Sequence, residues 1–107
     1  MEEKQTKTTG GLKERDKVKE PEQYDVLLHN DDVTTMDFVV ALLVKVFHKS
    51  EMDAIQIMLK VHRSGTGIAG TYPYDTAMTK CHTGISFARS HNFPLIITVE
   101  PSNKFKD

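Results

Sequence analysis

The stretch Tyr24–Phe47 reads YDVLLHNDDVTTMDFVVALLVKVF, and its hydrophobic period changes in the middle. Up to Leu28, apolar side chains alternate with others, as in a strand with one face on a core. From Met36 onward, apolar residues return every three or four positions, which is the spacing of an amphipathic helix. Between the two lies the polar run His29-Asn30-Asp31-Asp32. An amide and two carboxylates therefore stand where a strand gives way to a helix, and this cluster is suited to holding a positively charged group.

Three segments carry helical start signals, in each case a Ser, Thr or Asp ahead of an amphipathic run. The first helix is expected over about 35–48, with Thr34 and Asp37 as a capping-box-like start. The second is expected to start at Ser50, with Asp53 three residues later, and to stop at Gly65. The third is expected to start at Asp75.

Two further segments have the composition of strands, Ile68–Tyr72 and Leu95–Val99. The last is apolar on both faces, so we expect it in the centre of the sheet. The order of elements predicts an α+β domain of the type βααβαβ, with three helices packed on a three-stranded, mostly antiparallel sheet.

The predicted domain occupies residues 23–102. Before it, residues 1–20 contain only Leu12 and Val18 as apolar side chains after Met1. Such a segment cannot bury enough surface to offset its ordering entropy, so residues 1–22 are expected to form a disordered extension. Residues 103–107 are expected to form a flexible tail.

Composition excludes several classes of protein. The formal net charge of -1, with both signs mixed along the chain, gives no basic footprint for nucleic acid. The apolar run Phe38–Val44 is far shorter than the roughly 20 residues of a membrane span. The polar N-terminus lacks the apolar region of a signal peptide. The single cysteine, Cys81, excludes an internal disulfide and fits a reducing cytoplasm, where we expect the protein to reside.

Met58 and His62 lie one turn apart on the second helix, on the face expected to meet the first helix and the core. Each polar feature has an ordinary explanation of its own, because Asn and Asp favour turns and helix starts, and a histidine suits a helix C-terminus. Together, however, the polar run, the first turn of helix one and the Met58/His62 pair would enclose an apolar pocket with a polar rim.

A metal site and a hydrolase are competing uses of these side chains. The five histidines show no ligand spacing and there is no cysteine pair, so no metal is expected. An Asp with His62 could serve as acid and base, but the sequence carries no nucleophile or oxyanion-hole signature, and Cys81 falls on an expected core stripe. No catalytic residue and no cofactor are expected.

The chain resembles the ClpS adaptors, which hand N-degron substrates to a Clp-type AAA+ unfoldase. The resemblance covers about residues 23–100 and rests on Asn30-Asp31-Asp32, Thr34, Met36, Phe38-Val39, Met58-x-x-x-His62 with Gly65, Gly70-x-Tyr72, Ala77-x-x-Lys80, and Pro94-Leu95 with Glu100. The chain departs from the family at Thr35, where proline is usual, at Met78, where glutamate is usual, and at Gly84.

The resemblance implies a ClpS-like fold and a non-catalytic protein that binds the first residue of another polypeptide. It implies that Asn30, Asp31 and His62 hold the free α-amino group. It also implies a pocket for a bulky Leu, Phe, Tyr or Trp side chain, with Met36 as a gate against β-branched residues; the pocket residues are Asp32, Thr34, Met36, Val39, Met58, Val61 and Leu95.

The implied partners are N-degron polypeptides and the N-terminal domain of a ClpA-like or ClpC-like unfoldase. The resemblance implies that the unfoldase docks around Asp75 and Lys80 and that the N-terminal extension takes part in delivery. We expect a monomer that binds neither nucleic acid nor membranes. The alternative is a small interaction domain of similar fold that binds a translation or regulatory partner without recognising N-termini. This alternative leaves the combination of Asn30, Asp31 and His62 unexplained.

Overall fold

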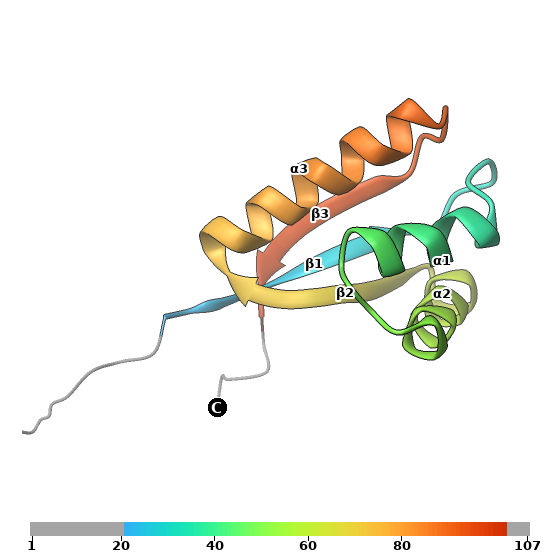
Figure 1. The fold of residues 1–107 in the computed structure, drawn as a ribbon. Helices are drawn as coiled ribbons and strands as arrows, with labels where there is room; N and C mark the ends of the chain where they lie inside the picture. The colour runs from blue at the N-terminus through green and yellow to red at the C-terminus, as the bar shows by residue number, and fades with distance from the viewer. Residues whose placement is uncertain (1–20, 103–107) are drawn as a thin grey trace, which may run out of the picture.

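A three-stranded sheet carries three helices in the computed structural model, which describes residues 21–102 (Figure 1). The elements are β1 (Gln23–His29), α1 (Met36–Lys45), α2 (Glu51–Ser64), β2 (Thr66–Pro73), α3 (Tyr74–Ser90) and β3 (Ile96–Pro101). The predicted order βααβαβ is confirmed. The predicted extension and tail lie outside the described residues, apart from Pro21 and Glu22. Within residues 21–102, no helix is both long and apolar enough to cross a membrane.

The sheet has the order β2-β1-β3, and both neighbouring pairs are antiparallel. The prediction that the last strand is central is wrong, because β1 holds that place. The second apolar face of β3 remains accessible at the edge of the sheet, where Ile96 is 55% exposed. Apolar side chains on both faces of a strand therefore did not mark the centre of this sheet.

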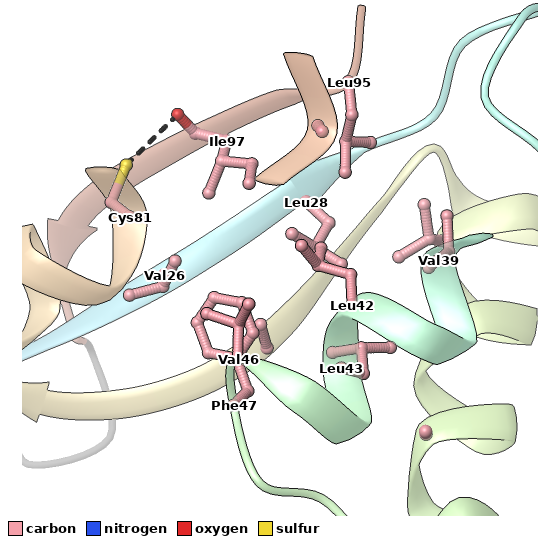
Figure 2. Packing of buried hydrophobic residues seen from close by; sticks show 14 of the residues in the cluster. Val26, Leu28, Val39, Leu42, Leu43, Val46, Phe47, Cys81, Leu95 and Ile97 are labelled. Carbon is pink, nitrogen blue, oxygen red and sulfur yellow. Dashed lines mark hydrogen bonds between the residues drawn. The ribbon is translucent and has the colours of Figure 1, made fainter. Parts of the chain in front are cut away.

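One face of the sheet carries the core. Val26 and Leu28 of β1 are fully buried and belong to one apolar cluster with residues from all three helices. Figure 2 shows these two side chains on the same side of β1 as Leu42 and Phe47. In Figure 1, α3 runs lengthwise along the sheet, while α1 and α2 lie side by side near the end of β1. The polar run that follows β1 is thus delivered to the two-helix end of the domain.

Close packing of α3 depends on its small residues. Ala77, Cys81, Gly84 and Ala88 are its buried positions. A Cβ atom added at Gly84 would lie 2.8 Å from Cδ1 of Ile97, so glycine lets this helix approach β3 closely. The Cys81 thiol lies 3.5 Å from the carbonyl oxygen of Ile97, and burial raises its pKa. Cys81 therefore has the surroundings of a packed core residue.

The start of α1 differs from the prediction. Thr35, and not Thr34, is the N-cap, and its hydroxyl accepts a hydrogen bond of 3.1 Å from the backbone N–H of Phe38. The helix ends at Lys45, earlier than predicted, and His48 then takes a left-handed conformation with φ 58°. The residue that departs from the family's usual proline is therefore the one that caps the helix.

The limits of α2 agree with the prediction. The hydroxyl of Ser50 accepts a hydrogen bond of 3.1 Å from the N–H of Asp53. At the other end Gly65 is left-handed, with φ 91°, and its N–H donates to the carbonyl of Val61 at 2.9 Å. A glycine suits this position because the left-handed conformation costs it no steric strain.

Candidate functional site

The loop between β1 and α1 is organised around the carboxylate of Asp31. Its Oδ1 accepts hydrogen bonds from the backbone N–H groups of Val33 at 2.8 Å and Thr34 at 2.7 Å. Its Oδ2 accepts a third, of 2.7 Å, from the hydroxyl of Thr34. These bonds form an Asx-type turn that fixes the orientation of the carboxylate before any ligand arrives.

A backbone hydrogen bond joins this loop to the end of α2. The N–H of Asn30 donates to the carbonyl of Gly65 at 2.9 Å. Because Gly65 directly follows the last turn of α2, this bond brings Asn30 and Asp31 to the same end of the domain as His62. Two segments that are distant in the sequence thus form one site.

The charge state of Asp31 results from opposing effects. Partial desolvation acts to raise the pKa of the carboxyl group, but hydrogen bonds from Thr34 and Val33 and the positive charge of Arg89 outweigh it, so the pKa lies below its ordinary value. Hydrogen bonds to the charged form of an acid stabilise that form. Asp31 is therefore a carboxylate at neutral pH.

The loop, α1 and α2 enclose a cavity of about 260 Å³. The residues that line it come from all three segments: Asn30, Asp31, Asp32, Thr34, Met36, Val39, Met58, Val61 and His62. They include every predicted amino-group and pocket residue except Leu95. Leu95 does not line the cavity; it is 1% exposed and belongs to the core cluster, whose packing Figure 2 shows.

Polar and apolar residues occupy different depths around the cavity. Asn30 and His62 are exposed, whereas Val39 and Val61 are buried. The prediction that His62 lies on the core-ward stripe of α2 is wrong, because Val61 takes the buried position and His62 stands at the rim. Met36 is 45% exposed and can cover the mouth. The cavity therefore has polar groups at its rim and apolar walls within.

This arrangement suits a cation attached to an apolar group. The rim offers a carboxylate, an amide oxygen and an imidazole nitrogen, all of which can accept hydrogen bonds from an ammonium group. The volume lies below the roughly 300 Å³ at which pockets for drug-sized ligands begin, so it fits about one amino-acid side chain. Among residues 21–102, no cluster of three or more His, Cys, Asp or Glu side chains is placed to hold a metal ion.

The predicted docking residues Asp75 and Lys80 line a different cavity, of about 490 Å³, at the C-terminal end of α1. Lys80 donates a hydrogen bond of 3.1 Å from Nζ to the carbonyl of Val46, and its ammonium lies 5.7 Å from the ring centroid of Tyr72. Asp75 is exposed in the first turn of α3. The two residues thus share one surface, well separated along the chain from the polar run.

Arg89 lies outside the cavity lining but influences the carboxylate of Asp31, which the sequence did not reveal. It acts on Asp31 through charge, and its Nη1 also donates to the carbonyls of Phe93 at 3.0 Å and Leu95 at 2.9 Å. A basic residue in the last turn of a helix is common in any protein, so sequence position alone gives no sign of this role. Only the packing of α3 against the sheet places Arg89 near the loop.

Comparison with known proteins identifies relatives along most of the chain. Residues 19–98 match the family model described as ATP-dependent Clp protease adaptor protein ClpS. A ClpS adapter protein from Myxococcus xanthus is 54% identical over 87 residues, which cover 81% of each chain. One from Acetivibrio thermocellus is 51% identical over 83 residues, covering 78% of this chain and 84% of the relative.

A solved structure supports the same relationship. It is Agrobacterium tumefaciens ClpS2 bound to L-phenylalaninamide, which is 35% identical and superimposes with a TM-score of 0.74. The match covers 78% of this chain and all of that one. The sequence resemblance is confirmed: this chain belongs to the ClpS family of ATP-dependent Clp protease adaptor proteins.

Proposed function

We propose that this protein binds the free N-terminal residue of polypeptides that begin with Leu, Phe, Tyr or Trp and delivers them to a Clp-type AAA+ unfoldase. The observation that carries the proposal is the cavity between the β1–α1 loop and α2, with hydrogen-bond acceptors at its rim and apolar walls. The relative bound to L-phenylalaninamide supports it, because that ligand joins a free amine to a large aromatic side chain.

The α-ammonium group of the substrate would be held by Asn30, Asp31 and His62. A carboxylate has about four acceptor sites, and the loop uses three of them on Asp31, two at Oδ1 and one at Oδ2. The site still free is on Oδ2, which we assign to the ammonium. A hydrogen bond to a charged group contributes roughly 1.5 to 3 kcal/mol, so removal of the charge on the substrate's amino group should lower the binding affinity.

The side chain of the first residue would enter between Val39, Met58 and Val61, with Asp32 and Thr34 at the edge. Burial of a Leu or Phe side chain contributes roughly 1.5 to 3 kcal/mol. Met36, which lines the cavity and is 45% exposed, would act as the gate against side chains that branch at Cβ. Leu95 would support the walls from the core rather than contact the substrate.

Delivery would use a second surface. We assign docking of the unfoldase's N-terminal domain to the cavity lined by Asp75 and Lys80, with the N-terminal extension taking part in transfer. In this role the protein is a cytoplasmic monomer without catalytic activity or cofactor of its own. Its one cysteine, Cys81, is a free thiol, which fits a reducing compartment.

Fluorescence anisotropy with four peptides tests the binding step. Peptides that begin with free Phe or Leu should bind. Peptides that begin with acetyl-Phe or with Val, and are otherwise identical, should bind at least about tenfold more weakly, which corresponds to about 1.4 kcal/mol. Asp31→Asn should lower the affinity for the Phe-initiated peptide. Asp53→Asn, on α2 and outside the cavity, is the matched control and should leave that affinity unchanged. Equal affinity for the Phe and acetyl-Phe peptides would refute the proposal.

A further inference from the structure

A second hollow adjoins the candidate site, between α1 and α2. It encloses about 620 Å³ and is lined mainly by aliphatic side chains, with charged residues at its edges: Asp37, Val40, Ala41, Val44, Lys45, Glu51, Ile55 and Met58. We refer to it as the interhelical groove.

Two aliphatic residues of this groove are not needed for the core. Val44 is 37% exposed and Ile55 is 38% exposed, whereas the core positions of α1 are Phe38, Val39, Leu42 and Leu43. Isolated exposed aliphatic residues are ordinary, but these two line the same hollow, one from each helix. The groove thus offers apolar surface that a bound side chain could cover.

Met58 connects the groove to the candidate site, because it lines both. Asp37, at the groove, also follows Met36, at the mouth of the site, directly in the sequence. The groove therefore adjoins the first cavity along both helices.

We propose that the interhelical groove binds the side chain of the third residue of a polypeptide whose first residue occupies the site, with a preference for large aliphatic side chains. The inference rests on the proposed function. In an extended chain, side chains of residues one and three point to the same side and lie about 6.6 Å apart. Measured along the axis of α2, Ile55 lies about 4.5 Å and Glu51 about 10.5 Å from Met58, so a chain that runs from the cavity toward the N-terminal end of α2 brings its third side chain into the groove.

Isothermal titration calorimetry with three ligands tests this inference: L-phenylalaninamide, a Phe-Ala-Leu peptide and a Phe-Ala-Ser peptide that are otherwise identical. The wild-type protein should bind the Leu peptide about fivefold more tightly than the Ser peptide, since partial burial of one aliphatic side chain is at stake. Ile55→Lys or Val44→Lys should abolish this preference and leave the affinity for L-phenylalaninamide unchanged. Both positions are exposed enough to accept lysine without loss of the core.

Met52→Lys is the matched control, because Met52 lies on α2, is 75% exposed and does not line the groove. It should retain the wild-type preference. Failure of L-phenylalaninamide to bind would overturn the proposed function, and the groove inference with it. Binding of L-phenylalaninamide with equal affinity for the Leu and Ser peptides would overturn the groove inference alone. So would a wild-type dimer in sedimentation that Ile55→Lys dissociates, since a second copy would then occupy the groove.

Discussion

The hydroxyl of Thr34 donates a 2.7 Å hydrogen bond to Oδ2 of Asp31, the oxygen that we assign to the substrate's ammonium group. Thr34 and Asp31 are also joined through the backbone N–H of Thr34 and Oδ1. The threonine therefore orients the carboxylate and stabilises its charged form, in addition to lining the cavity.

Replacement of Thr34 should change the acidity of Asp31. Thr34→Val keeps the branched shape but removes the hydroxyl donor, so the pKa of Asp31 should rise toward its ordinary value of 3.8. Thr34→Ser, which keeps the donor, should leave it low. Carbon chemical shifts of the carboxyl group, followed by NMR during an acid titration, measure the difference. An equal pKa in the wild-type and Thr34→Val proteins would contradict this role.

The lowered pKa of Asp31 makes the free energy of unfolding depend on pH in the acidic range. Because the pKa of Asp31 is lower in the folded than in the unfolded protein, its stabilising contribution is complete above the ordinary value and is lost as the pH falls through the folded value. The free energy of unfolding should fall more steeply below about pH 4 for the wild-type protein than for Thr34→Val. Urea unfolding at several acidic pH values provides the comparison.

Removal of the Met36 side chain should relax the choice of first residue. Met36→Ala opens the mouth of the cavity, so the ratio of affinities for Phe-initiated and Val-initiated peptides should fall by about tenfold. Anisotropy titrations give both affinities. Met52→Ala, on an exposed part of α2, should leave the ratio unchanged. A Met36→Ala protein that rejects Val as strongly as the wild type does would argue against a gate.

Lys80 should contribute to folding as well as to docking. Its Nζ donates to the carbonyl of Val46, where α1 ends, and a cation there also interacts favourably with the helix dipole. Lys80→Met keeps the aliphatic stem and should lower the free energy of unfolding by about 0.5 to 1.5 kcal/mol, measured by urea denaturation. Lys60→Met, on the exposed face of α2, is the control and should change stability little.

Gly70 should not tolerate a side chain while Tyr72 keeps its position. A Cβ at Gly70 would collide with the phenol ring of Tyr72, which folds back over the glycine. Gly70→Ala should cost about 1 kcal/mol, the lower end of overpacking costs, because the atoms in the way belong to the outer end of a side chain that can shift. The cost should shrink in a Tyr72→Ala background, and a double-mutant cycle from thermal unfolding reports that coupling. Additive effects of the two substitutions would contradict the collision.

The elements were predictable because their signals are local. The strand period before Leu28, the helical period after Met36, the cap at Ser50 and the left-handed Gly65 each depend on a few neighbouring residues. The shift of the α1 cap from Thr34 to Thr35 was not predictable in this way. Both threonines can cap a helix, and the choice follows from Asp31, which takes the hydroxyl of Thr34 for its own turn.

The site was only partly readable from the sequence. Spacing placed Met58 and His62 on one helix, but it did not show that Val61 is buried while His62 reaches the rim. The depth of Leu95 and the proximity of Arg89 to Asp31 depend on how α3 packs against the sheet. Such long-range placements have no local signal, so they required the folded chain.

The hydrogen bond from Asn30 to Gly65 also has a consequence for protein synthesis. The two halves of the site are made at different times, since the ribosome produces the Asp31 loop well before it produces α2 and Gly65. Closing a long loop must precede the contact that joins them. A nascent chain that stops before α2 therefore has no site, and the protein can take up its first ligand only after the second helix has emerged and docked.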